Sequence, residues 1–354
     1  MLLHNRIDSR ILKQQMEKSQ EERLTLSFYA YAHITSPEEF RDHLYASWLE
    51  FNILGRVYVS KEGINAQISV PNEQFESFKA QLDTIEFLGG IRLNVAIEDD
   101  GKSFFKLKIK VREKIVADGL NDASFDVTKR GRHISAEEFN RLTDDTNTIV
   151  VDMRNHYESE VGHFENAILP DADTFRDALP IVKETLTPYK DRTIIMYCTG
   201  GIRCEKASAY FKHLGFEHVH QLEGGIIKYA RDIKAKGLPN KFKGKNFVFD
   251  ERLGERISDE VISQCHQCGK ACDTHVNCVN DACHLLFIQC EECAAKHEGC
   301  CSDECNSFIH LPEEEQKSLR KKYQQKRNVF KKGRADHLKE HWLNGAELTL
   351  KKDS

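Results

Sequence analysis

Hydrophobic and polar residues alternate with two different periods over the first 122 positions of the chain. The run LTLSFYAYAHI is typical of a strand, whereas SPEEFRDHLYASWLEFNI opens with a serine cap and a glutamate three residues on, as helices do. GRVYVS and INAQISV, on either side of a Lys-Glu-Gly turn, indicate a hairpin, and NEQFESFKAQLDTI returns to a helical period. Further strands are expected in IRLNVAI and FFKLKIKV. The order β-α-β-β-α-β predicts an α+β domain of the ferredoxin-like (split βαβ, acylphosphatase-like) type over residues 1–122.

The last of these strands carries a basic residue at every second position. Successive side chains of a strand point to opposite faces, so the cations should line one face while the apolar residues face the core. They would stand roughly 6.6 Å apart, close to the phosphate spacing of an extended nucleic-acid strand. Lysines that protect an edge strand from aggregation are the alternative. Contact with RNA or DNA is favoured, because edge protection does not need five such residues. The predicted contacts are Lys106, Lys108, Lys110, Arg112 and Lys114.

A different pattern, of strands alternating with helices, occupies residues 146–240. It follows a polar connector at 122–145. TIVVDMRN, TIIMYCTG and HVHQL have the composition of buried strands, and EKASAYFKHLG that of a helix. This order predicts a parallel α/β sheet, whose functional site lies at the carboxyl ends of the strands.

The loop after TIIMY combines two cysteines, two glycines and an arginine within seven residues. Because Cys198 precedes a helix N-terminus and lies near Arg203, its pKa should be lowered, which would make it a thiolate nucleophile. The glycines let backbone amides point at whatever the sulfur carries. The C-x4-R spacing is one residue shorter than the phosphate loop of cysteine phosphatases, so it favours a terminal persulfide sulfur. Two incidental buried cysteines would leave the other residues unexplained. The predicted cradle consists of Thr199, Gly200, Gly201 and Ile202.

Cys204, directly after the arginine, has two interpretations. It could be a resolving thiol that attacks an oxidised or persulfidated Cys198. It could equally be a small buried residue in the first helical turn. The sequence favours neither.

Ten of the twelve cysteines fall between residues 265 and 305. In a chain without a secretory signal pattern, this crowding favours metal ligation over disulfides. CHQC and CEEC are two C-x2-C knuckles at a spacing that suits one tetrahedral four-thiolate site. Structural zinc is expected in this segment (260–310), with an iron–sulfur cluster or unligated thiols as alternatives. The predicted ligands are Cys265, Cys268, Cys290 and Cys293 for one ion, and Cys278, Cys283, Cys301 and Cys305 for a second.

The net charge of −5 is unevenly distributed. Residues 311–354 hold twelve Lys or Arg against seven Asp or Glu, so this region is basic and the rest of the chain is acidic. A basic helical tail fits binding to an RNA backbone, and a solvated charged helix is the alternative. The predicted contacts are Lys321, Lys322, Lys326 and Arg327. No stretch reaches the ~18–20 apolar residues that span a bilayer, and the N-terminus lacks the apolar region of a signal peptide. We therefore expect a cytoplasmic protein without a membrane partner.

Three segments of the second domain resemble the signature segments of rhodanese domains: VDMRNHYESEVGHFENAI, YCTGGIRCEKA and GFEHVHQLEGGI. This resemblance implies that Cys198 is the persulfide carrier, and that Asp152 and Arg154 support the sheet and the loop without reacting. Combined with GRVYVSKEGINAQ, LKIKVREKIV and the cysteine-rich segment, the pattern resembles the bacterial tRNA uridine(34) hydroxylase family over nearly the whole chain.

The family resemblance implies a tRNA-modifying oxidoreductase that converts the wobble uridine of the anticodon loop to 5-hydroxyuridine. Dioxygen would be the co-substrate, the electron donor is unknown, and no DNA partner is expected. The expected catalytic residues are Cys198, Arg203 and Cys204. Hydroxylation follows from the resemblance alone, because the sequence has no dinucleotide fingerprint and no two-His-one-carboxylate set. A persulfide sulfurtransferase and an RNA-binding adaptor with an inactive rhodanese domain are the alternatives.

Overall fold

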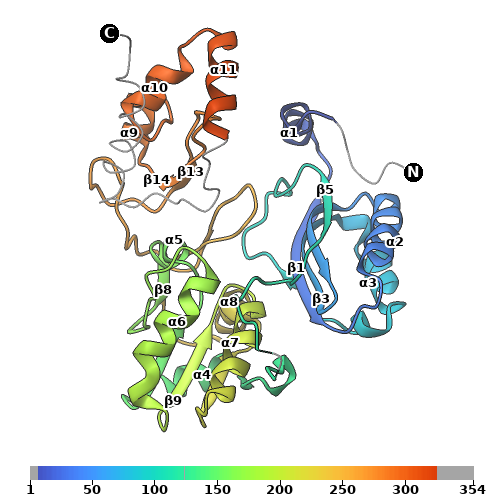
Figure 1. Ribbon diagram of the computed structural model, residues 1–354, viewed down its shortest axis with the longest axis vertical. Coiled ribbons are helices and arrows are strands. Elements are labelled where there is room, and N and C mark those ends of the chain that lie inside the picture. The colour runs from blue at the N-terminus through green and yellow to red at the C-terminus, as the bar shows by residue number, and fades with distance from the viewer. Residues whose placement is uncertain (1–6, 123, 325–354) are drawn as a thin grey trace.

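Three regions follow one another in the computed structural model, which describes residues 7–122 and 124–324 (Figure 1). They are an N-terminal mixed sheet, a parallel α/β domain and a cysteine-rich C-terminal region. Across these residues no helix combines the length and apolar character needed to cross a membrane.

The N-terminal sheet has the strand order β4-β1-β3-β2-β5. Its first four strands pair antiparallel in the ferredoxin-like order, and β5 adds to the edge parallel to β2. Helices α2 and α3 cover one face, where Phe28, Trp48 and Phe78 pack edge to face in the core. The predicted α+β domain is therefore confirmed. Its elements are α1 (Ser9–Lys18), β1 (Arg23–Tyr31), α2 (Pro37–Glu50), β2 (Leu54–Ser60), β3 (Gly63–Pro71), α3 (Phe75–Asp83), β4 (Asn94–Val95) and β5 (Leu107–Val111).

The strand with alternating cations is shorter than its sequence pattern suggests. Leu107 and Ile109 face the core, and the lysines between and after them are exposed, as the period of two predicts. The strand ends at Val111, however, and Lys114 does not join the row of cations. Its ammonium group lies 2.6 Å from a carboxylate oxygen of the buried Asp118. This internal ion pair takes the Lys114 charge out of the row of exposed cations.

The second domain contains a parallel sheet of order β6-β10-β9-β7. One hydrophobic cluster packs α4 and α8 against it, and another packs α6 and α7. This is the predicted parallel α/β architecture. Its elements are β6 (Arg132–Ile134), α4 (Ala136–Leu142), β7 (Thr148–Asp152), α5 (His156–Ser159), β8 (Gly162–Phe164), α6 (Phe175–Leu186), β9 (Thr193–Tyr197), α7 (Ile202–His213), β10 (Val219–Leu222) and α8 (Gly225–Lys236).

The segment that the sequence suggested as a polar connector contributes β6 and α4 to this domain. Only Ile134 of the three residues in β6 is buried, so the strand has no hydrophobic alternation to reveal it. Ser135 caps α4, with its side-chain oxygen accepting the amide of Glu138. This cap is a local signal of the helix that follows.

The cysteine-rich region begins after a small three-stranded sheet of order β12-β11-β8, which joins it to the parallel domain. A short hairpin and the helices α9, α10 and α11 follow (Figure 1). The elements are β11 (Phe242–Asn246), β12 (Glu255–Arg256), β13 (His275–Asn277), β14 (Leu286–Ile288), α9 (Glu291–Lys296), α10 (Asp303–Ile309) and α11 (Glu313–Gln324). The predicted cysteine-rich C-terminal region is confirmed, with one buried cluster of its own and a second that it shares with the parallel domain.

Candidate active site and metal centres

The Cys198 loop lies at the carboxyl end of a central strand of the parallel sheet. Cys198 follows β9 directly, and α7 begins at Ile202. The Cys198 side chain is fully buried, and the amide of Gly201 donates to its Sγ at 3.2 Å. Gly201 has φ +103°, a conformation that side chains with a Cβ rarely adopt. One predicted feature of the cradle is thus present, because a loop amide points at the sulfur.

The environment of Cys198 favours its thiolate form. Burial alone would raise the pKa of this thiol. A hydrogen bond from the Cys204 thiol, the charge of Arg203 and the amides of Cys204 and Gly201 together lower the pKa of Cys198 to about 6. Burial and the bond to Cys198 raise the pKa of Cys204. At neutral pH the pair is therefore a thiolate that accepts a hydrogen bond from a neighbouring thiol.

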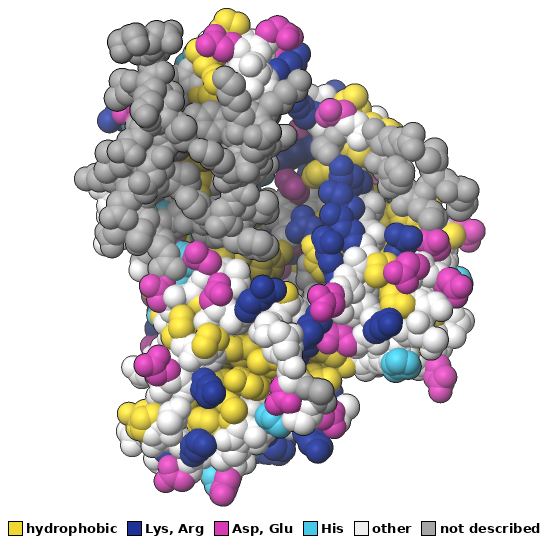
Figure 2. All heavy atoms as spheres, in the orientation of Figure 1, with side chains coloured by type: hydrophobic (Ala, Val, Ile, Leu, Met, Phe, Trp, Pro, Cys, Tyr) yellow, Lys and Arg dark blue, Asp and Glu magenta, His cyan; other side chains and the backbone are white. Residues whose placement is uncertain are grey.

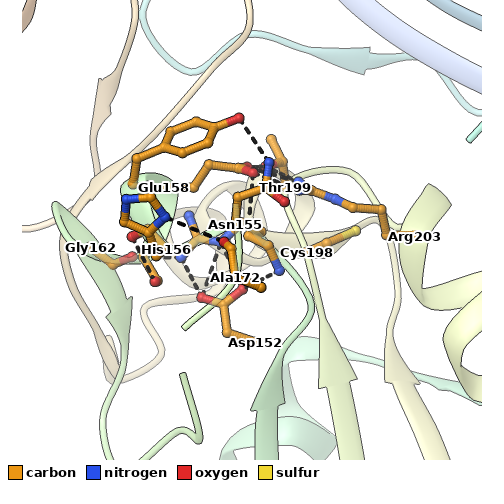
Figure 3. A network of polar contacts seen from close by, with 12 residues as sticks. Asp152, Asn155, His156, Glu158, Gly162, Ala172, Cys198, Thr199 and Arg203 are labelled. Atoms are coloured by element: carbon orange, nitrogen blue, oxygen red, sulfur yellow. Dashed lines mark hydrogen bonds and ion pairs between the residues drawn. The ribbon is translucent and has the colours of Figure 1, made fainter. Parts of the chain in front are cut away.

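Arg203 is held by a carboxylate that sequence analysis did not identify. Its two terminal nitrogens lie 2.6 and 2.8 Å from the two carboxylate oxygens of Glu158, and both side chains are buried (Figure 3). Burial opposes the charge of Arg203, but Glu158 outweighs it and raises the pKa of the guanidinium. Glu158 also accepts the amide of Asn155 at 3.1 Å, the back-bond of a capping box. The Asn-x-x-Glu pattern at the start of α5 is the signal that could have revealed it.

The predicted supporting pair lies behind the loop. Arg154 and Asp152 are both fully buried, with Nη2 and Oδ2 2.6 Å apart. Arg154 also donates to the carbonyl of Gly162 at 2.6 Å, which joins the end of β7 to β8. Burial opposes the charge of Arg154, while the charge of Asp152 raises the pKa of the guanidinium. These contacts tie the ends of β7 and β8 together behind the loop, and the supporting role that the rhodanese resemblance implies stays a prediction.

The N-terminal sheet covers the Cys198 loop with side chains of β1 and β4. The Tyr29 hydroxyl donates to the Glu205 carboxylate at 3.0 Å. A Cβ placed on Gly201 would lie only 2.8 Å from the same hydroxyl. Tyr31 donates to the carbonyl of Ile202 at 3.2 Å. Sequence analysis missed these residues, because nothing in a strand pattern says which distant loop its outer face will meet.

A buried lysine joins the two domains beside this contact. The Lys206 ammonium lies 2.6 Å from a carboxylate oxygen of Asp118 and 2.8 Å from one of Glu62. It also donates to the carbonyl of Val116 at 3.0 Å. Glu62 in turn accepts the amide of Ile115 at 2.8 Å. A buried cation with two carboxylate partners fixes how the N-terminal sheet sits on α7.

The eight cysteines predicted as ligands converge in the two predicted groups of four. Within each group the sulfur atoms all lie within 4.8 Å of one another. The Sγ–Sγ distances of Cys268–Cys290 and Cys283–Cys301 are 3.7 Å, and that of Cys301–Cys305 is 3.8 Å. Tetrahedral ligands at a Zn–S distance of about 2.3 Å would be separated by about 3.75 Å. Both groups therefore have the geometry of a site for one metal ion.

The first group is packed against the parallel domain. Cys265 and Cys293 share a hydrophobic cluster with Tyr157 of α5. His266, inside the first knuckle, has its Nε2 2.8 Å from a carboxylate oxygen of Glu160, at the end of the same helix. The first cysteine group therefore contacts α5, the helix that carries Glu158.

The predicted RNA-binding cations have different positions. Lys108, Lys110 and Arg112 are exposed on the open face of the N-terminal sheet, and Lys106 is half-buried. Figure 2 shows Lys and Arg side chains gathered along the hollow between this sheet and the rest of the molecule. In the tail, Lys321 and Lys322 belong to α11, but their side chains, like Lys326 and Arg327, lie outside the described residues.

Comparison with known proteins covers all three regions. Residues 23–115 match the UPF0176 acylphosphatase like domain, 135–232 the Rhodanese-like domain and 243–306 the Rhodanase C-terminal family. The tRNA uridine(34) hydroxylase of Photorhabdus laumondii is 54% identical over 98% of both chains. That of Pectobacterium carotovorum is 56% identical over 94% of both chains. A solved rhodanese-like domain from Anabaena is 22% identical, with a TM-score of 0.26, and covers 32% of this chain and 78% of that one.

Identity above half, over almost the full length of both chains, far exceeds what a shared rhodanese domain alone would give. The resemblance found in the sequence motifs is thereby confirmed. The chain belongs to the family of tRNA uridine(34) hydroxylases.

Proposed function

We propose that this protein hydroxylates C5 of the wobble uridine of tRNA, with dioxygen as co-substrate, two electrons from an external donor and Cys198 as the reactive group. The observation that carries the proposal is a buried thiolate in a loop of two glycines and an arginine, in a chain whose relatives bear the name of this activity. Thiolates are nucleophiles and can also be oxidised reversibly, so Cys198 has the reactivity that a modification site needs.

Each part of the site has a distinct role in this proposal. The amide of Gly201 and the thiol of Cys204 stabilise the negative charge on Cys198. Arg203 adds a positive charge that stabilises the thiolate, and its ion pair with Glu158 holds it in place beside the loop. Asp152 and Arg154 fix the strand ends beneath the loop.

We propose zinc for both cysteine groups, in a structural role. Four thiolates form a closed tetrahedral site, which leaves no position for a substrate. A multi-iron cluster would separate its ligand sulfur atoms further, because the four sulfurs are divided among two or more iron atoms. Each zinc ion would cross-link the short strands and helices of this region, which are too small to form a large hydrophobic core.

The RNA partner in the proposal is the anticodon loop of tRNA. The exposed cations of β5 and the basic tail fit contacts with its phosphates. Lys108 and Lys110 of β5 project from the same sheet face as Tyr29, which contacts the helix after the Cys198 loop. RNA bound to these lysines would therefore lie on the side of the sheet that faces the proposed nucleophile.

The test is the 5-hydroxyuridine content of tRNA from cells that lack the gene and carry a plasmid copy. The Cys198→Ser variant is expected to reduce this nucleoside at least a hundredfold by mass spectrometry, because serine is not ionised at neutral pH. Cys272→Ser is the matched control, since Cys272 is also buried but lies outside the loop and both cysteine groups. Undiminished 5-hydroxyuridine with Cys198→Ser contradicts the proposal. Loss of a thiouridine in its place would identify a sulfurtransferase.

A further inference from the structure

The open face of the N-terminal sheet carries two rows of polar and aromatic side chains. Residues paired across neighbouring strands project from the same face, so the strand register defines each row. The first row crosses β5, β2, β3 and β1 and consists of Lys110, Tyr58, Asn65 and Tyr29. The second row lies beside it, extends to β4 and consists of Lys108, Arg56, Gln67, Ser27 and Asn94. Helices α2 and α3 pack on the opposite face.

The β5 end of the two rows is strongly cationic. Arg56, Lys108 and Lys110 are exposed, and none of them has an ion-pair partner among the described residues. Partial burial and the charges of Lys106, Lys110 and Arg56 lower the pKa of Lys108. Cations at neighbouring positions of one sheet face, in a region of the chain that is acidic as a whole, are suited to bind a polyanion.

The middle of the rows offers surfaces that nucleobases bind. The ring of Tyr58 is half-exposed, and the guanidinium of Arg112 lies 5.6 Å from its centre. The carboxamides of Asn65 and Gln67 are half-exposed on the next strand. An aromatic ring among cations is typical of single-stranded nucleic-acid sites, where bases stack on the ring while phosphates bind the cations.

The far end of the rows meets the Cys198 loop. The Tyr29 hydroxyl faces Gly201, and the Asn94 side-chain nitrogen would lie 3.6 Å from a Cβ on Gly200. Asn94 is 7% exposed, and its carboxamide makes no hydrogen bond to the part of the chain that the structure describes. Lys110 and Tyr29 are three strand spacings apart, about 14 Å. A short stretch of RNA can therefore contact the cations and the loop at the same time.

We propose that these two rows form a polar track that binds single-stranded RNA next to the target base and directs that base to the Cys198 loop. This proposal rests on the proposed function in one respect, namely that the bound RNA is the anticodon loop of tRNA. Arg56 and Lys108 bind phosphates, Tyr58 stacks on a flanking base, and Asn94 contacts the base nearest the loop. The cations of β5 are then the entrance of a path that ends at the nucleophile.

The first experiment measures binding of a fluorescent anticodon stem-loop to the full chain by anisotropy at several salt concentrations. Tyr58→Leu is expected to weaken binding about tenfold, because one stacked base contributes on that order, and Tyr58→Phe to restore it. Arg56→Ala should reduce the slope of log affinity against log salt by about one. Lys183→Ala is the control, since Lys183 is exposed on α6 of the other domain. Unchanged binding by Tyr58→Leu and Arg56→Ala overturns the polar track.

The second experiment replaces Tyr58 by p-benzoylphenylalanine and maps the crosslinked nucleotide. A crosslink within a few nucleotides of position 34 is expected, and crosslinks confined to the stem overturn the proposal. Neither assay depends on hydroxylation, so the two proposals fail separately. If tRNA keeps its 5-hydroxyuridine without the gene while Tyr58→Leu loses RNA binding, only the proposed function fails. If 5-hydroxyuridine is lost and the variants bind normally, only the polar track fails.

Discussion

The Cys198 loop and the cysteine-rich region both contain buried thiols, but different groups surround the thiols in each. Around Cys198, an amide, a thiol and a guanidinium stabilise one thiolate. In each cysteine group, four sulfur atoms lie within 4.8 Å of one another. Four thiolates at such distances repel strongly unless a cation lies between them. The number of thiols that converge, more than the presence of cysteine, distinguishes the proposed reactive site from the two candidate metal sites.

The two regions therefore differ in what they need in order to keep their structure. The protein itself supplies every donor that stabilises Cys198, so the loop should form without a ligand. The cysteine groups should form only with an ion, because metal binding is coupled to folding in small cysteine-rich units. Three predictions test this difference, in order of decreasing effect.

The largest effect is expected from losing a metal ligand. Cys293→Ser should reduce the metal content from two ions per chain to one and unfold the first cysteine group. Structural zinc contributes about 10–16 kcal/mol in zinc-finger peptides, more than the remaining contacts of such a unit can replace. Elemental analysis and limited proteolysis around residues 260–300 measure the two effects.

Cys272→Ser is the matched control and should keep both ions, because Cys272 belongs to neither group. Two ions retained by Cys293→Ser would contradict the assignment of ligands. If Cys198 lost its thiolate reactivity together with the metal, the loop would also depend on the ion. The proposed difference between the two regions would then be wrong.

A smaller effect is expected within the loop when its ion pair is broken. Glu158→Gln leaves the buried Arg203 without its carboxylate, and breaking one side of a buried pair costs about 3–5 kcal/mol. The free energy of local opening, measured by hydrogen exchange of residues 198–213, should fall by that amount. Glu184→Gln is the control, since Glu184 is exposed on α6 of the same domain, away from the loop. Equal exchange in both variants would show that Arg203 does not need Glu158.

The features that the sequence predicted are those that depend on local spacing. The C-x4-R loop, the two C-x2-C knuckles and the period of two in β5 depend on residues only a few positions apart, or on one repeated spacing. The structure brings the predicted cysteines together in both groups. β6 escaped prediction, because a three-residue strand with one buried side chain has no period. The ion pair of Lys114 with the buried Asp118 was not readable from the strand pattern, because Asp118 lies beyond the strand.

The contact between the N-terminal sheet and the Cys198 loop could not be predicted, because it depends on how the two domains pack. Tyr29 and Tyr31 belong to an ordinary strand pattern, and only the packed structure brings their hydroxyl groups to the Cys198 loop. Glu158 is an intermediate case. Its capping position was readable from the sequence, but its bond to Arg203, 45 residues away, was not.

The smallest predicted effect concerns the donor to the thiolate. Cys204→Ala removes the hydrogen bond that Cys198 accepts from the neighbouring thiol and should raise the pKa of Cys198 above its value of about 6. One such bond corresponds to about one pKa unit, or ~1.4 kcal/mol. Only the thiolate is alkylated, so the rate of iodoacetamide modification rises with pH, and its midpoint should move to higher pH in the variant. Mass spectrometry of the peptide that contains Cys198 gives the rate.

The same variant separates the two interpretations of Cys204. If Cys204 is only a buried hydrogen-bond donor, Cys204→Ala changes the midpoint of alkylation. The products that mild peroxide forms at Cys198 then stay the same as in the wild type. A resolving thiol forms a disulfide with oxidised Cys198, so the wild type should then yield a Cys198–Cys204 disulfide where Cys204→Ala accumulates sulfenic acid. An unchanged midpoint in Cys204→Ala would show that the loop amides and Arg203 suffice to lower the pKa. The contrast with the cysteine groups would then be sharper, because a single thiolate would need no second thiol at all.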